Sequence, residues 1–267
     1  MAQDGSLSGS VALVAGASRG IGADIARYLA AAGVKVAVAA RTQAQADPRL
    51  PGTIHSVTQE ITDAGGEAIP VVLNLRDPEA IAAAVTQVLG QWGRLDILVN
   101  NAAIFVPGSL ETVQPRHIDL SMQVNLRGPI LAMREAIPRM RAAGGGHIIN
   151  LSSRGSTPPG PGPYDTARAG GDGDIFYGAE KSMIEHFSQR QALALQESNI
   201  AVNVLSPMGA IRTPGFLFAG NDPVNPTLEF ETADAMGKAA VWICGQAPAQ
   251  FTGNIVYDEE LVQARGL

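Results

Sequence analysis

Short apolar runs alternate along the chain with longer segments that have the length of a helix. Each short run is typical of one buried strand. We expect strands at residues 11–15, 35–39, 68–73, 95–99, 147–151, 201–205 and 254–257. We expect helices at residues 21–32, 53–64, 78–92, 114–142 and 177–196.

Strands that alternate with helices form right-handed crossovers and a parallel sheet whose two faces are both covered. The predicted fold class is therefore α/β, a Rossmann-type doubly wound parallel sheet of about seven strands with helices on both faces. No internal repeat or interdomain linker interrupts the pattern, so residues 1–267 are expected to form a single domain. Sites in such sheets lie at the carboxyl ends of the strands.

A glycine-rich turn joins the first strand to the first helix. Its sequence is Gly-Ala-Ser-Arg-Gly-Ile-Gly, residues 16–22. Glycines let a backbone come close to a pyrophosphate, and the amino terminus of a helix offers free N–H groups and partial positive charge. The alternative is a tight turn that binds no ligand. We predict a dinucleotide site with contacts from Gly16, Ser18, Arg19, Gly20, Ile21 and Gly22.

The end of the second strand bears on the choice of cofactor. A carboxylate at this position binds the ribose 2′-hydroxyl of NAD and repels a 2′-phosphate, but this chain has Ala40 and Arg41 there. Arg41 and Arg19 supply two guanidiniums, which suit a 2′-phosphate. The sequence therefore favours NADP(H) over NAD(H). If Arg41 is only a solvated loop residue, an NAD-preferring enzyme is the alternative.

Further residues at the predicted carboxyl edge are candidates for the cofactor cleft. Asn74 and Leu75 follow the third strand, where they would lie near an adenine ring. Asn100, Asn101 and Ala102 follow the fourth strand. Two adjacent amides can either line the cleft or hold neighbouring strands together, and the sequence leaves both roles open.

The segment Tyr177-Gly-Ala-Glu-Lys181 opens the last long helix. Residues four apart lie on the same face of a helix, so the phenol and the ammonium should point into the same space. A free phenol titrates near 10, and a nearby cation lowers that pKa toward the range useful for acid–base catalysis. The pair alone is a weak motif and gains its weight from the glycine turn that precedes it.

The long helix expected at residues 114–142 contains Asn125 and, four residues later, Pro129. Proline has no N–H, so the helical hydrogen bond from residue 129 to the Asn125 carbonyl cannot form. A free carbonyl and a side-chain amide at one kink could hold an ordered water. This predicts a water-mediated proton path beside Tyr177 and Lys181. A bend required only for packing is the alternative.

Composition narrows the class of protein. The net charge is −6 and no basic run occurs, which argues against a nucleic-acid partner. The single Cys244 excludes an internal disulfide and a cysteine-based zinc site, and the histidines have no close metal spacing, so no metal is expected. No stretch is long enough to span a bilayer, and the first ten residues do not have the layout of a signal peptide. We expect a cytoplasmic protein.

Taken together, these motifs resemble the short-chain dehydrogenase/reductase family, in the family's order and over nearly the whole chain. Gly16, Gly20 and Gly22 match its glycine motif, and residues 100–102 match its strand-four motif. The resemblance implies a catalytic tetrad and a segment that holds the nicotinamide carboxamide and the phosphates. The tetrad is Asn125, Ser153, Tyr177 and Lys181, and the segment contains Pro207, Ile211 and Thr213.

Two stretches are similar to the hydroxysteroid-dehydrogenase-like branch, residues 50–66 and 251–260. A sterol-carrier domain often follows the reductase in that branch, and we expect no counterpart of it in this sequence. The chain departs from the family pattern at four positions that carry no proton-transfer group. These are Ala15, Asn74, Ala103 and Met208.

The stretch between Ser153 and Tyr177 is longer than is typical of the family. Residues 155–174 are rich in glycine and proline and are expected to form a loop over the site. Within it, Tyr164 precedes Arg168 by four residues and lies closer to the family's usual distance from Ser153. We reject Tyr164 as the acid because arginine differs from lysine in donor geometry and the segment has too many glycines and prolines for a helix.

The resemblance implies reversible hydride transfer between nicotinamide and a carbonyl or secondary-alcohol carbon. Tyr177 would exchange the proton, Ser153 would hydrogen-bond the substrate oxygen, Lys181 would lower the Tyr177 pKa and hold the ribose, and Asn125 would support the water. A non-catalytic dinucleotide-binding sensor or scaffold is the competing hypothesis from another class.

The substrate is expected to be a hydrophobic small molecule. Residues 213–230 contain aromatic residues between turns, which suits a lid, although ordinary packing of a loop is an equal alternative. The lid residues are Phe216, Leu217, Phe218 and Phe230. The resemblance further implies a homodimer or homotetramer that pairs through the helices containing Asn125 and Tyr177.

Overall fold

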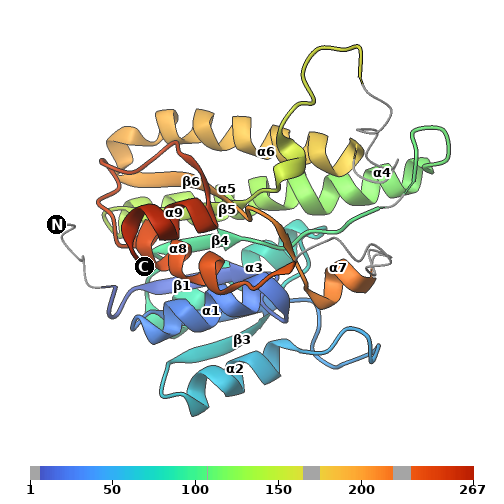
Figure 1. Ribbon diagram of the computed structural model, residues 1–267. Coiled ribbons are helices and arrows are strands. Elements are labelled where there is room, and N and C mark those ends of the chain that lie inside the picture. Colours follow the sequence, from blue (N-terminus) through green and yellow to red (C-terminus); the bar gives the residue numbers. More distant parts are fainter. Residues whose placement is uncertain (1–6, 107, 165–174, 219–229) are drawn as a thin grey trace.

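The computed structural model describes residues 7–106, 108–164, 175–218 and 230–267. In this part of the chain, one parallel sheet contains seven strands in the order β3-β2-β1-β4-β5-β6-β9 (Figure 1). The strands are β1 (Val11–Ala15), β2 (Lys35–Ala40), β3 (Ala68–Val72), β4 (Ile97–Asn100), β5 (Gly146–Leu151), β6 (Ile200–Ser206) and β9 (Ile255–Tyr257). The order reverses between β1 and β4, as in a doubly wound sheet. The predicted fold class is confirmed.

Helices cover both faces of this sheet (Figure 1). The apolar residues of α1, α2, α8 and α9 join the core on one face, and those of α3, α5 and α6 join the core on the other. The helices of the described residues are α1 (Gly20–Ala31), α2 (Ile54–Asp63), α3 (Pro78–Trp92), α4 (Pro115–Met122), α5 (Gly128–Ala142), α6 (Ile175–Ala194), α7 (Pro214–Phe218), α8 (Asp234–Cys244) and α9 (Asp258–Arg265).

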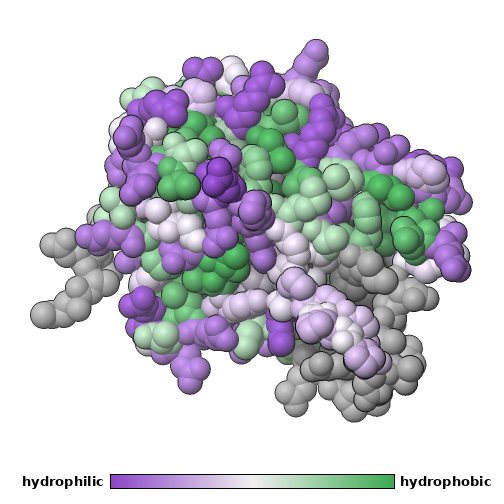
Figure 2. Space-filling view, turned by 90° about the horizontal axis from the view of Figure 1, so that it is seen from above, coloured by the Kyte–Doolittle hydropathy of each residue, from purple (hydrophilic) through white to green (hydrophobic). Residues whose placement is uncertain are grey.

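The face of the molecule that carries α6 mixes hydrophilic and hydrophobic side chains, as Figure 2 shows from above. On the outer side of α6, Met183 and Leu193 are exposed. Next to α6 in the fold, the segment from α4 to α5 contributes the apolar residues Met122, Leu126 and Ile130 to a shallow groove of about 340 Å³.

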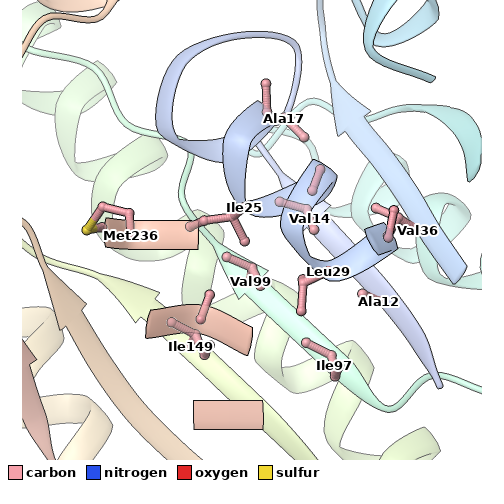
Figure 3. Packing of buried hydrophobic residues seen from close by; sticks show 14 of the residues in the cluster. Ala12, Val14, Ala17, Ile25, Leu29, Val36, Ile97, Val99, Ile149 and Met236 are labelled. Carbon is pink, nitrogen blue, oxygen red and sulfur yellow. The ribbon is translucent and has the colours of Figure 1, made fainter. Parts of the chain in front are cut away.

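The two cores follow from the alternation of side chains along each strand. In β1, Ala12 and Val14 face the core beneath α1 and α8, whereas Leu13 faces the core beneath α3 and α5. Figure 3 shows the first core, where Ile25 and Leu29 of α1 lie over the central strands. The central strand β1 is buried on both faces, which is why its sequence is continuously apolar.

The sequence analysis predicted no helix at α8 or α9. Helix α8 begins after Ala233 without a side-chain cap, and Gly237 lies in its interior, so its local helix signals are weak. Packing explains the glycine: a Cβ at Gly237 would lie 2.2 Å from Cδ2 of Tyr28 on α1. The close packing of α8 on α1 therefore requires a glycine at this position.

The single helix predicted at residues 114–142 is present as three pieces. Between α4 and α5, residues Gln123–Arg127 form one wide π-helical turn. The N–H of Gly128 bonds to the Gln123 carbonyl, five residues earlier. Because Pro129 cannot donate to the Asn125 carbonyl, the chain widens here while it stays helical. The prediction of a disturbance at Pro129 was sound, but its form is a π turn at Asn125.

Candidate active site

The glycine turn packs directly against the end of β4. Gly16 has a φ of +82°, and a Cβ there would lie 2.6 Å from Cα of Ala102. A Cβ at Gly22 would lie 2.3 Å from Nδ2 of Asn101, the atom that donates a 3.0 Å hydrogen bond to the Gly16 carbonyl. These contacts leave no room for side chains. The side chain of Asn101 therefore has a structural role, because it holds the glycine turn against the segment after β4.

Asn100 joins neighbouring strands. Its Nδ2 donates to Oδ1 of Asn150 on β5 at 2.8 Å, and Nδ2 of Asn150 in turn donates to Oγ of Ser188 on α6 at 2.8 Å. This buried polar chain links β4, β5 and α6. It fixes the strand that precedes Ser153 against the helix that contains Tyr177.

The amino terminus of α1 suits a phosphate. Helix α1 begins at Gly20, and its N-cap residue Arg19 makes no side-chain cap hydrogen bond, so no side chain competes for the first N–H groups. Thr213 lies over the turn, since a Cβ at Gly20 would be 3.1 Å from Cβ of Thr213. Ser18 is buried and Ile21 is partly buried in the same turn. The structure therefore brings Thr213 next to the glycine turn.

Arg19 does not point freely into this space. Its guanidinium donates to the carbonyls of Pro51 at 3.0 Å, Leu50 at 3.2 Å and Gly52 at 2.9 Å. Burial lowers the pKa of Arg19. Arg19 thus holds the 50–52 loop onto the glycine turn, a role that the sequence analysis did not foresee. Arg41, at the end of β2, is exposed.

Asn74 and Leu75 follow β3 as predicted. Oδ1 of Asn74 accepts from the N–H of Arg76 at 3.2 Å, which closes a tight turn. Leu75 is 5% exposed, and a Cβ at Gly128 would lie 2.7 Å from its Cβ. The side chain of Leu75 belongs to the core, so its contact with a cofactor would come from the edge of that side chain or from its backbone.

Tyr177 and Lys181 lie together on α6. Nζ of Lys181 is 5.3 Å from the centroid of the Tyr177 ring and donates to the Leu151 carbonyl at 2.7 Å. Burial lowers the pKa of Lys181 to about 8, against the opposing charges of Glu180 and Glu185. A buried lysine this close to a phenol is the arrangement that the spacing of four residues predicts.

Asn125 supports Tyr177 indirectly. Its side chain bonds to both backbone groups of Ile104: Oδ1 accepts from the N–H at 2.8 Å, and Nδ2 donates to the carbonyl at 2.8 Å. The next residue, Phe105, meets the Tyr177 ring edge-on at a centroid distance of 5.9 Å. Nδ2 also donates to Oε2 of Glu180 at 2.7 Å. These hydrogen bonds occupy the side-chain amide of Asn125. An ordered water at the π turn would therefore have to bond to main-chain atoms.

Ser153 follows β5 and begins the short 3₁₀ turn Arg154–Ser156. Its Oγ accepts from the N–H of Gly155 at 3.2 Å, which leaves the hydroxyl hydrogen available for donation. A Cβ at Gly178 would lie 2.3 Å from the Gly155 carbonyl oxygen, and Ser182 donates to the Ser156 carbonyl. The first turns of α6, with Tyr177, are thus held against the turn that Ser153 opens.

Three charged side chains hold the turn after β6, which contains Pro207. The Met208 N–H donates to Oδ1 of Asp258, and the Gly209 N–H donates to Oε2 of Glu231, each at 2.8 Å. Nη1 of Arg154 donates to the Met208 carbonyl at 3.2 Å. Asp258 is fully buried, and burial raises the pKa of its carboxyl group.

The sequence analysis missed Asp258 and Glu231 as residues of the site. The position of Asp258 at the end of the last strand, on the carboxyl edge of the sheet, was the available signal. Downstream of the turn, Ile211 is buried in β7 (Ala210–Ile211), which pairs with β8 (Phe230–Glu231).

Part of the predicted substrate region lies outside the described residues, namely 165–174 of the insertion, including Arg168, and 219–229 of the lid. Tyr164 is 60% exposed and donates to the Gly160 carbonyl of its own loop at 2.5 Å. This agrees with its rejection as the acid. In the lid, Phe216 and Phe230 meet edge-on with a centroid distance of 5.9 Å.

No helix in the described part of the chain is long and apolar enough to cross a membrane. Among the same residues, no group of three or more His, Cys, Asp or Glu side chains is placed to hold a metal ion.

Comparisons with known proteins identify the family of this chain. A family model described as short chain dehydrogenase matches residues 10–217. Hydroxysteroid dehydrogenase-like protein 2 of Xenopus tropicalis is 38% identical over 267 residues, which cover 98% of this chain and 60% of that protein. The human protein of the same name is 35% identical, with the same coverage. The chain therefore spans less than two thirds of the length of these relatives.

Solved structures of similar proteins cover nearly the whole chain. A short chain dehydrogenase from Mycobacterium thermoresistibile has a TM-score of 0.82 at 30% identity and covers 98% of this chain and 89% of its own. A metagenomic short-chain oxidoreductase in complex with NADP has a TM-score of 0.75 at 34% identity, with coverages of 94% and 98%. The 3-ketoacyl-(acyl-carrier-protein) reductase of Brucella melitensis, complexed with NADH, has a TM-score of 0.78 at 30% identity, with coverages of 94% and 97%. The chain belongs to the short-chain dehydrogenase/reductase family of NAD(P)-dependent oxidoreductases, in the hydroxysteroid-dehydrogenase-like branch.

Proposed function

We propose that this protein is an NADP(H)-dependent oxidoreductase that interconverts a carbonyl and a secondary alcohol on a hydrophobic small molecule. The observation that carries the proposal is the buried Lys181 ammonium, 5.3 Å from the centroid of the Tyr177 ring. The pair lies at the carboxyl edge of the sheet, where the glycine turn and an uncapped helix terminus suit a dinucleotide pyrophosphate.

The residues of the tetrad divide the work of proton transfer. The nicotinamide supplies or accepts the hydride when it is bound. In reduction, Tyr177 gives its phenolic proton to the substrate oxygen, and in oxidation it takes that proton back. Ser153 donates a hydrogen bond to the same oxygen and fixes its position. Lys181 favours the phenolate by its charge and would hold the ribose hydroxyls.

The proposed preference for NADP(H) depends mainly on the end of β2. No carboxylate follows Ala40 to repel a 2′-phosphate, and Arg41 is exposed and available to bind one. Arg19 supports the preference less than its sequence position suggests, because its guanidinium is bonded to the 50–52 loop. The similar structures include one with NADP and one with NADH, so they do not favour either cofactor. The proposed preference therefore depends on the residues at the end of β2.

A hydrophobic substrate is proposed from the apolar side chains beside Tyr177 and in the lid segment. Phe105 lies against Tyr177, and Phe216 lies against Phe230 in the lid. An apolar enclosure excludes water from the reacting carbonyl and favours apolar ligands. The name of the relatives refers to hydroxysteroids, but these residues support only the broader class of hydrophobic carbonyl compounds and alcohols.

We also propose a homodimer or homotetramer in the cytoplasm that pairs through the α4–α5 and α6 surface. Met183 and Leu193 are exposed on α6, and Met122 and Ile130 line the groove along α4 and α5. Apolar side chains gathered on one face favour association. Size-exclusion chromatography with light scattering tests the state directly, and a monomer at micromolar concentration would contradict it.

Two measurements test the function. Titration of the intrinsic fluorescence with NADPH and NADH should give a lower Kd for NADPH. A panel of hydrophobic ketones with the preferred cofactor should then show turnover. If the cofactor binds tightly and no ketone or alcohol in the panel reacts, the alternative of a dinucleotide-binding sensor or scaffold gains support.

A further inference from the structure

A buried carboxylate that the proposed mechanism does not use lies next to the tetrad. Glu180 is 1% exposed and precedes Lys181 on α6. Its Oε2 accepts from Nδ2 of Asn125 at 2.7 Å and from Oγ of Ser121 at 2.8 Å. Its Oε1 is also buried and has no hydrogen-bond partner among the described residues. Burial of a carboxyl group costs free energy unless the group is hydrogen-bonded or its charge is paired.

Both hydrogen bonds of Glu180 come from neutral donors and converge on Oε2. Hydrogen bonds donated to a carboxyl oxygen favour the carboxylate form. Burial raises the pKa of Glu180, while the bonds from Asn125 and Ser121 and the charge of Lys181 oppose that shift. The donors from α4 and the π turn are neutral, so the charge that acts on this carboxyl group is that of Lys181.

Glu180 also lies next to the catalytic pair along α6. It is three residues after Tyr177, a spacing that makes these two residues neighbours on the helix surface, and it directly precedes Lys181 in the sequence. Its charge acts on Lys181, whose other acidic neighbour is Glu185. The Glu180 side chain therefore accepts a hydrogen bond from Asn125 and acts on Lys181 by its charge.

We propose that Glu180 is a positioning residue: its hydrogen bonds hold Asn125 in the contact that supports Ile104, and its negative charge keeps Lys181 protonated beside Tyr177. The inference depends on the proposed oxidoreductase function. It assigns no step of bond making to Glu180. The carboxylate keeps two other members of the tetrad in the state that proton transfer requires.

Two substitutions separate the charge from the contact. Glu180→Gln removes the charge and keeps a side chain of the same length. Glu180→Asp keeps the charge and withdraws it from Asn125. Glu197→Gln is the matched control, because Glu197 is exposed beyond the end of α6. For each variant, kcat and KM are measured from pH 6 to pH 10 with the preferred cofactor and a reactive ketone, and folding is checked by thermal unfolding.

Without the negative charge, Lys181 should lose its proton at a lower pH. The alkaline limit of kcat should therefore move down by about one pH unit in Glu180→Gln. In Glu180→Asp the limit should stay in place, while kcat at pH 7 falls about tenfold because Asn125 is no longer held. KM should change little in either variant. The Glu197→Gln control should match the wild type.

An unchanged pH limit in folded Glu180→Gln would overturn the charge role, and an unchanged kcat in Glu180→Asp would overturn the positioning role. If Glu180→Gln does not fold, a shifted pH limit in Glu180→Asp overturns the inference instead. A wild-type protein without turnover on the ketone panel is a different outcome, since it removes the proposed function. In that case the pH dependence of NADPH binding by wild type and Glu180→Gln still tests whether Glu180 controls the charge of Lys181.

Discussion

Gly178 lies so close to Gly155 that a Cβ on Gly178 would be 2.3 Å from the Gly155 carbonyl oxygen. The contact joins the first turn of α6 to the 3₁₀ turn after Ser153. Tyr177 directly precedes Gly178, and Ser153 directly precedes the 3₁₀ turn. The absence of a side chain on Gly178 therefore lets the segments that contain these two proposed catalytic residues pack closely.

Gly178→Ala should separate α6 from this turn. We expect a loss of about 1–3 kcal/mol in the free energy of unfolding, as for overpacking elsewhere, and a fall in kcat of about tenfold or more because Tyr177 and Ser153 move apart. Chemical denaturation and steady-state kinetics measure the two effects. Gly90→Ala in α3 is the control: a Cβ there has open space, so stability should stay level or rise. Equal behaviour of the two variants would contradict the contact.

The buried Lys181 predicts a pH dependence of stability. Its pKa is about 8 in the folded protein against an ordinary value of 10.5. Below pH 8 both states hold the proton, and the folded state bears the cost of a buried charge. Above pH 8 the unfolded chain binds more protons than the folded chain, so this group makes the free energy of unfolding rise with pH.

The useful window for this test is about pH 8 to 9. Above it, the buried thiol of Cys244, whose pKa is raised to about 12 from 9, contributes with the opposite sign. Urea unfolding across the window should show wild type gaining stability relative to Lys181→Met, which has no group to titrate at this position. Parallel curves for the two proteins would show that the lysine is not perturbed as described.

Arg41 should determine the choice of cofactor. Arg41→Ala should raise the Kd for NADPH about tenfold, which corresponds to the loss of one charge-assisted hydrogen bond, and should leave the Kd for NADH unchanged. Fluorescence titration of both cofactors provides the measurement. Arg134→Ala is the control, since that guanidinium is exposed on α5. An equal effect on both cofactors would exclude a contact with the 2′-phosphate.

Asp258 should stabilise the turn after β6. Asp258→Ala removes the acceptor for the Met208 N–H, and we expect a loss of about 1–3 kcal/mol in the free energy of unfolding together with weaker cofactor binding. Glu260→Ala, at an exposed position two residues further along α9, is the matched control. Chemical denaturation measures the stability of both variants, and titration measures their cofactor binding. If the cofactor Kd is unchanged in Asp258→Ala while stability falls, the turn does not contribute to binding.

The sequence alone predicted the central sheet because its strands are buried on both faces, and continuous apolar runs of this kind are visible without tertiary information. It also predicted the Tyr177 and Lys181 pair, because the spacing of four residues is a property of the helix itself. It missed α8, whose glycine Gly237 packs against Tyr28, far apart in the sequence. Local helix propensity does not depend on a contact between residues so far apart in the sequence.

The same reason explains which hydrogen-bond partners in the site the sequence analysis missed. Arg19 stands in the glycine turn, but its partners are the carbonyls of residues 50–52, which only the folded chain brings near. Glu180 lies within the quoted motif, yet its role depends on Asn125 and Ser121 on other elements. Positions of single residues were predictable from strands and helices, whereas their hydrogen-bond partners were not.

The central claim is that the Tyr177 phenol transfers the proton in a nicotinamide-dependent reaction. Tyr177→Phe removes only the hydroxyl group and keeps the ring that meets Phe105. Its turnover of a ketone reduced by the wild type should fall by at least about a thousandfold, while the Kd for the preferred cofactor stays within about twofold. Turnover near the wild-type rate in Tyr177→Phe would contradict the account.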